Sequence, residues 1–132
     1  MAGCTTPSQS ADPDFTCTFA HRASSIASLK RLPTPLRQAL HARVGEMADR
    51  GEFFNAGDVV SRPAPFDRFI RGGEIGEKWY VWYEHGGIAY WKQILLFGSD
   101  PSGAAQVVAE AHGAGSESLC AQTDRLLDGL AH

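Results

Sequence analysis

The chain has 132 residues and a net charge of −3, a size at which a domain can bury about two-thirds of its unfolded surface without help from a metal or a disulfide. The longest basic run is Lys30-Arg31, so we expect no nucleic-acid partner. No stretch approaches the roughly 20 apolar residues of a membrane span. The Cys and His residues show no metal-ligand spacing, and we expect neither a metal nor a cofactor.

The N-terminal residues allow two interpretations. Residues 1–15 are mostly polar and predict a disordered tail before a single domain over 16–132. The simplest interpretation is a cytoplasmic protein with three free thiols. Alternatively, Met1 to Cys4 has the small-small-Cys shape of a bacterial lipoprotein cleavage box, if the recorded start lies inside a signal peptide. Cys4 would then carry a lipid anchor in the periplasm, and Cys17 and Cys120 would remain as an even pair able to form a disulfide.

The first regular element is a predicted helix over 35–50. Pro35 suits the first helical position, and the apolar residues that follow recur at helical spacing. Gly51 is a natural stop after this pattern. The apolar stripe of this helix consists of Leu36, Leu40, Val44 and Met47.

Three β-strands are predicted after a connector rich in Gly and Pro. They cover about 66–75, 78–84 and 88–97, and short glycine-containing turns at Gly76 and at Gly86-Gly87 join them into an antiparallel meander. Residues 102–112 are rich in alanine and predict a helix, and a last helix is expected over about 116–130. The fold class is therefore α+β, with the sheet packed by helix 35–50 and by the C-terminal helix.

The second and third strands form an aromatic hairpin. All three Trp and all three Tyr residues of the chain lie between Trp79 and Trp91. Side chains alternate across a strand, yet both faces of this hairpin are apolar. Helices could cover both faces, one face could receive a partner, or an aromatic pocket could lie between sheet and helix. The candidate binding residues are Tyr80, Trp82, Trp91, Tyr83 and Tyr90.

A second candidate site is a polar rim at the end of the sheet. Glu84 and His85 are adjacent at the hairpin tip, although neighbouring strand residues point to opposite faces. Arg71 and Lys92 can join them on the rim. This set gives the alternative of a small hydrolase or nuclease.

We expect a non-enzymatic binding domain of the adaptor, inhibitor or immunity type. Its partner would be another protein or a second copy of the chain, because an exposed face with several aromatic side chains is rarely left in water. A tethered periplasmic lipoprotein domain is the third alternative.

Overall fold

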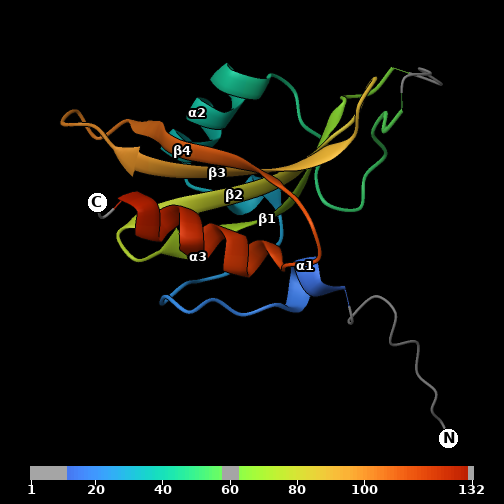
Figure 1. The fold of residues 1–132 in the computed structure, drawn as a ribbon. Helices are drawn as coiled ribbons and strands as arrows, with labels where there is room; N and C mark the ends of the chain where they lie inside the picture. The colour runs from blue at the N-terminus through green and yellow to red at the C-terminus, as the bar shows by residue number, and fades with distance from the viewer. Residues whose placement is uncertain (1–11, 58–62, 131–132) are drawn as a thin grey trace, which may run out of the picture.

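The computed structural model describes residues 12–57 and 63–130, so Cys4 and most of the expected tail lie outside the described residues. A four-stranded antiparallel sheet forms the centre, with helices on both of its faces (Figure 1). The helices are α1 (Pro13–Thr16), a 3₁₀ turn η1 (Leu29–Arg31), α2 (Thr34–Val44) and α3 (Leu119–Leu130), and the strands are β1 (Asp67–Ile75), β2 (Lys78–His85), β3 (Trp91–Ser99) and β4 (Ala105–Gly113).

The α+β class and the antiparallel sheet are confirmed, but the expected number of three strands is wrong. The sheet order is β1-β2-β3-β4, with each strand paired to the next along the chain. The fourth strand occupies the alanine-rich segment for which a helix was predicted. Tertiary pairing with β3 outweighs the helix propensity of alanine here.

A tight turn before β4 sets up this pairing. The Asp100 carboxylate accepts hydrogen bonds from the backbone N–H groups of Ser102 and Ala104, at 2.9 and 3.0 Å. Gly103 adopts a φ of 90°, which favours glycine. The chain therefore reverses directly after β3, which places the next residues beside this strand.

The β2–β3 connection fixes which aromatic residues share a face. His85 pairs with Trp91, so residues 86–90 connect the strands and their number is odd. Trp91 consequently lies on the same face as Tyr83 and opposite to Trp82, whereas an even loop would have placed it beside Trp82.

Helix α2 is shorter than the predicted helix. It ends at Val44, because Gly45 adopts a φ of 89° and leaves the helical conformation. The predicted end at residue 50 is therefore wrong. The following chain is held by Asp49, which accepts hydrogen bonds from the Ser28 hydroxyl (2.7 Å) and the Leu29 N–H (2.8 Å).

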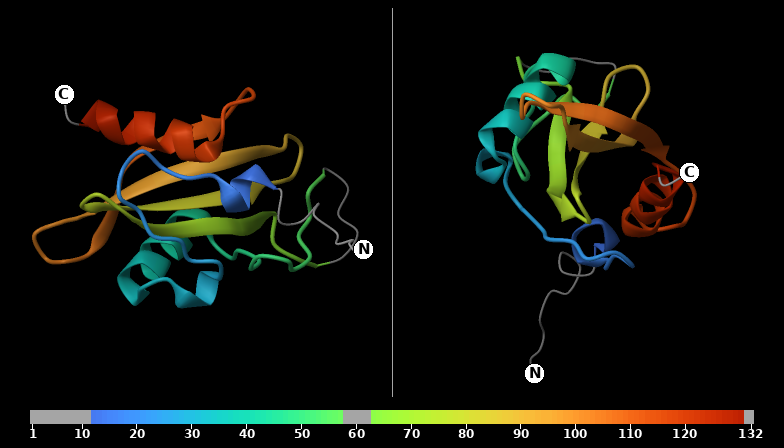
Figure 2. Two further views of the ribbon diagram at one scale, coloured as in Figure 1. Left: turned by 90° about the horizontal axis from the view of Figure 1, so that it is seen from below. Right: turned by 90° about the vertical axis from the view of Figure 1, so that its left-hand side faces the viewer.

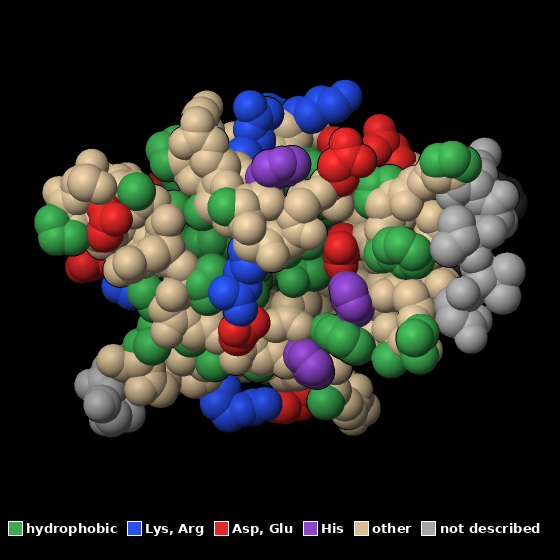
Figure 3. All heavy atoms as spheres, turned by 90° about the horizontal axis from the view of Figure 1, so that it is seen from above, with side chains coloured by type: hydrophobic (Ala, Val, Ile, Leu, Met, Phe, Trp, Pro, Cys, Tyr) green, Lys and Arg blue, Asp and Glu red, His purple; other side chains and the backbone are tan. Residues whose placement is uncertain are grey.

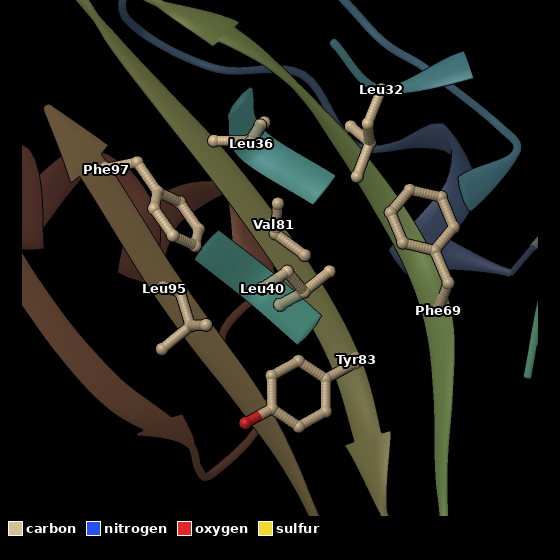
Figure 4. Close-up of a cluster of buried hydrophobic side chains, with 8 residues drawn as sticks. All are labelled: Leu32, Leu36, Leu40, Phe69, Val81, Tyr83, Leu95 and Phe97. Atoms are coloured by element: carbon tan, nitrogen blue, oxygen red, sulfur yellow. The ribbon is translucent and has the colours of Figure 1, made fainter. Parts of the chain in front are cut away.

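The α2 face of the sheet carries one of the two core clusters. In Figure 4, the leucines of α2 and of the connection before it lie against Phe69 of β1 and against alternate residues of β2 and β3, and Tyr83 lies beyond Leu40 at the end of this row. All members are at most 8% exposed. The cluster consists of Leu32, Leu36, Leu40, Phe69, Val81, Tyr83, Leu95 and Phe97.

The opposite face is covered by α3 and by the N-terminal segment, as the right-hand view in Figure 2 shows. Helix α3 begins at Leu119, after Ser118 caps the N–H of Ala121 at 3.1 Å, rather than near residue 116 as expected. A disulfide joins Cys17 of the N-terminal segment to Cys120 of α3. The second cluster contains Ile70, Ile75, Tyr80, Trp82, Ile94, Leu96, Leu119 and Cys120.

The outer edge of β1 is occupied by two other stretches of the chain. Ala23 and Ile26 form isolated antiparallel bridges with it, and Ala48 forms a parallel bridge with Arg68. None of the helices in the described ranges has the length and apolarity required to cross a membrane.

Candidate functional site

Three of the five predicted binding residues belong to the core clusters, and two of these three are completely buried. Tyr80 and Trp82 have no exposed surface. The Trp82 indole N–H donates to Thr123 Oγ1 of α3 at 2.9 Å, and the Tyr80 hydroxyl donates to the Ser24 carbonyl at 2.8 Å. These side chains are therefore sealed against the α3 layer and unavailable to a partner in this conformation.

The predicted polar rim does not form one site. Glu84 and His85 point to opposite faces of the sheet, as strand alternation requires. On the α3 face, Glu84 accepts hydrogen bonds from Arg68 Nε and from the Tyr90 hydroxyl, both at 2.8 Å. The two residues that the hydrolase or nuclease alternative combined therefore lie on different faces of the sheet.

The two basic residues of that rim are also placed elsewhere. Lys92 pairs with Asp14 at 2.5 Å. A bulge between Phe69 and Arg71 turns Arg71 inward, where it is 8% exposed. The Arg71 guanidinium lies 3.6 Å from the sulfur of Cys17 and 3.5 Å from that of Cys120, and it also donates to the Cys17 carbonyl at 3.1 Å.

A polar pocket lies on the α2 face, at the end of the sheet that α2 leaves uncovered. This His85 pocket has a volume of about 490 Å³. Figure 3 shows histidine and acidic side chains gathered beside apolar ones on this face. Its lining residues are Arg43, Val44, Asp67, Tyr83, His85, Trp91, Gln93, Glu110 and His112.

An acid–imidazole pair forms one wall of the His85 pocket. The bulge in β1 places Asp67 directly across from His85, and Asp67 Oδ1 lies 2.6 Å from His85 Nδ1. Asp67 is only 6% exposed, and its burial raises the pKa of the carboxyl despite the opposing effect of His85. A carboxylate on Nδ1 favours the tautomer with the proton on that nitrogen, which leaves Nε2 as an acceptor.

Tyr83 forms the floor of the pocket next to this pair. Burial is the main cause that raises the pKa of its phenol to about 12, and the carboxylates of Asp67 and Glu110 raise it further against the effect of Arg43. The phenol therefore stays protonated throughout the physiological range.

Three aromatic rings form a row across β2, β3 and β4. The Trp91 ring lies between His85 (centroids 4.4 Å apart) and His112 (4.6 Å). The Trp91 indole N–H donates to Gln93 Oε1 at 2.8 Å, and Gln93 Nε2 donates to Glu110 Oε1 at 3.0 Å. Glu110 also pairs with Arg43. These bonds fix the wall of the pocket opposite Asp67.

Exposed apolar side chains surround the hairpin turn beside the pocket. Ile88 is 95% exposed and Phe66 is 40% exposed, and both line a hollow of about 600 Å³ with Trp91. We name Phe66, Ile88 and Trp91 the hairpin-end surface; Tyr90, 49% exposed, flanks it. The surface and the His85 pocket share Asp67, His85 and Trp91.

The hairpin turn is held against two other segments of the same chain. The Gly86 N–H donates to the Phe66 carbonyl at 2.6 Å. A Cβ at Gly86 would lie 2.2 Å from the Asn55 carbonyl oxygen, so only glycine permits this approach. The exposed residues thus project from an anchored turn.

Of the sequence-predicted residues, the structure therefore brings Tyr83, His85 and Trp91 together, and separates them from Tyr80, Trp82, Glu84, Arg71 and Lys92. Sequence reasoning missed the other residues of the pocket, namely Arg43, Asp67, Gln93, Glu110 and His112. Their spacing along the chain carries no motif, and only alternation along a correctly registered β4 would have placed Glu110 and His112 on this face.

In the part of the chain that the structure describes, no group of three or more His, Cys, Asp or Glu side chains is arranged to hold a metal ion. Comparisons of this chain with known protein families, with curated proteins and with solved structures find no significant match.

Proposed function

We propose that this protein is a non-enzymatic binding domain that contacts another protein through the hairpin-end surface. The observation that supports this most directly is Ile88, whose side chain is 95% exposed on an anchored turn. Phe66 and Trp91 lie beside it around the same hollow. Exposed apolar side chains grouped at one place are typical of interaction sites, and their burial by a partner is favourable.

The proposed surface differs from the surface that the sequence suggested. Trp91 and the neighbouring Tyr90 remain in it, whereas Tyr80 and Trp82 do not. The Cys17–Cys120 disulfide favours an oxidising compartment and so supports the periplasmic alternative over the cytoplasmic one.

A site-specific photo-cross-linker tests this proposal. We would replace Ile88 by a photoreactive phenylalanine analogue in the producing cells, and use Glu77, exposed at the opposite end of the hairpin, as the control position. Position 88 should give one predominant adduct, which position 77 does not give. Mass spectrometry identifies the adduct as another protein or as a second copy of the chain.

The identified partner is then purified and titrated with three forms of the protein. Ile88→Asp should weaken binding about tenfold or more, since a carboxylate replaces a buried apolar contact. Gln106→Glu, at an exposed position of β4, should bind like the wild type. Equal affinity of Ile88→Asp and wild type would contradict the proposal.

A further inference from the structure

Two oxygens of the His85 pocket have no protein partner among the described residues. The Tyr83 hydroxyl makes no hydrogen bond, although this side chain is only 8% exposed. Asp67 uses Oδ1 for His85, while Oδ2 has no partner. Neither oxygen is fully shielded from solvent, so the pocket offers two accessible acceptors to a ligand with N–H donors.

The charges of the pocket favour a cation. Arg43 and Glu110 pair with each other, and the second oxygen of Glu110 accepts from Gln93. Asp67 is then the carboxylate left with only a histidine beside it, and His85 neutralises that charge only when it is protonated. A cation near Asp67 gains Coulomb energy in a partly desolvated site, whereas an anion would lose it.

The position of the pocket indicates where such a cation would come from. The His85 pocket shares three residues with the hollow around Ile88, so a chain lying on the hairpin-end surface can extend a side chain into it. Lys and Arg have apolar stems that can lie along Val44 and Trp91 while their charged ends reach inward. A pocket of about 490 Å³ has room for a side chain of this length.

We propose that the His85 pocket binds a basic side chain, lysine or arginine, of the partner protein, with Asp67 and Tyr83 as its acceptors. This inference rests on the proposed function, because it assigns the pocket to the same bound partner. It adds that the partner must present a basic residue beside the apolar group that covers Ile88.

The test uses single amino-acid amides as probes and the isotopically labelled full-length protein. N-acetyl-arginine amide and N-acetyl-lysine amide are titrated while the Trp91 indole N–H signal is followed by NMR, since this group belongs to the pocket wall. N-acetyl-citrulline amide is the matched neutral control for arginine, and N-acetyl-glutamate amide is the anionic control. We expect saturable shifts with one or both basic amides. The controls should bind at least about tenfold more weakly.

Three variants connect the shifts to the proposed acceptors. Asp67→Asn should weaken binding of the basic amide about tenfold or more, and Tyr83→Phe a few-fold, in line with the loss of a charge-assisted and an ordinary hydrogen bond. Glu77→Gln, at the far end of the hairpin, should change nothing. Tyr83→Phe keeps the test decisive if Asp67→Asn fails to fold. Equal binding of citrulline and arginine amides, or no effect of either acceptor variant, would overturn the inference.

The two proposals fail in distinguishable ways. Ile88→Ser, which adds no charge beside the pocket, should weaken partner binding without changing the affinity for the amides. A partner that cross-links at position 88 while no amide binds would overturn only the assignment of the pocket. Amide binding without any cross-link at position 88 would overturn the protein partner and with it the assignment of the cation to a side chain.

Discussion

The two faces of the sheet are covered to different extents, although both carry aromatic residues of the same hairpin. On the α3 face, a helix, the N-terminal segment and a disulfide enclose Tyr80 and Trp82, whose polar atoms have partners. On the α2 face, the helix ends at Val44, and beyond it Tyr83 and Asp67 each retain one oxygen without a partner among residues 12–57 and 63–130. The additional cover from the N-terminal segment therefore encloses the aromatic residues of the α3 face, whereas Tyr83 lines a pocket beyond the end of α2.

The largest expected effect concerns the disulfide that closes the α3 face. Replacing Cys17 and Cys120 together by Ser should lower the free energy of unfolding by about 4.7 kcal/mol, the chain-entropy value for a closed loop of roughly 100 residues. The sequence separation of the two cysteines is 103. Guanidinium denaturation measures the loss, and reductant should lower the stability of the wild type but not of the variant. A loss under about 1 kcal/mol would show that the α3 face holds without the bond.

The next largest effect compares one tryptophan from each face. Trp82→Ala should cost about 3–5 kcal/mol, because it empties a fully buried position and leaves Thr123 without its donor. Trp91→Ala, at a half-buried position, should cost about 1–2 kcal/mol, and Ile88→Ala less than about 0.5. Urea denaturation of the three variants gives the order. Equal losses for the two tryptophans would contradict the difference between the faces.

The smallest effect is a pH dependence at Tyr83. The folded state raises the pKa of this phenol to about 12, so the unfolded state releases the proton first. Folding stability therefore falls as the pH rises from 10 towards about 12, and Tyr83→Phe should lack this contribution. At neutral pH the variant should differ from the wild type by less than about 0.5 kcal/mol, since the hydroxyl has no partner to lose in the described part of the chain. Denaturation curves at neutral and alkaline pH test both expectations.

Local patterns of the sequence predicted the elements that depend on local physics. Helical spacing around Leu36 and Leu40, and glycine turns at Gly76 and Gly86, indicated α2 and the β1–β2–β3 meander. The predictions failed where two signals competed. Gly45 and Gly51 both have positive φ, and sequence alone favoured the later one as the helix end. In segment 102–112, the helix propensity of alanine competed with strand pairing to β3, and the pairing determined the structure.

The site was less predictable because two bulges shift the register of the sheet. Continuing the pairing of Ile75 with Lys78 without the bulge after Phe69 would place Arg68 opposite His85, whereas the observed register places Asp67 there. A second irregularity, between Leu96 and Phe97, shifts the pairing of β3 with β4 in the same way. A shift of one residue moves the following side chains to the opposite face of the sheet, and no sequence pattern predicted either shift.

The bridges along β1 have a consequence for how copies of this protein can associate through their backbones. Ala23, Ile26 and Ala48 already occupy hydrogen-bonding positions along that border of the sheet. In the described chain, β4 is the terminal strand on the other side, where its outward N–H and C=O groups face no further strand. Strand addition by a second copy or by an extended peptide is thereby restricted to β4, and two copies paired through their β4 strands would have no free edge left to add a third.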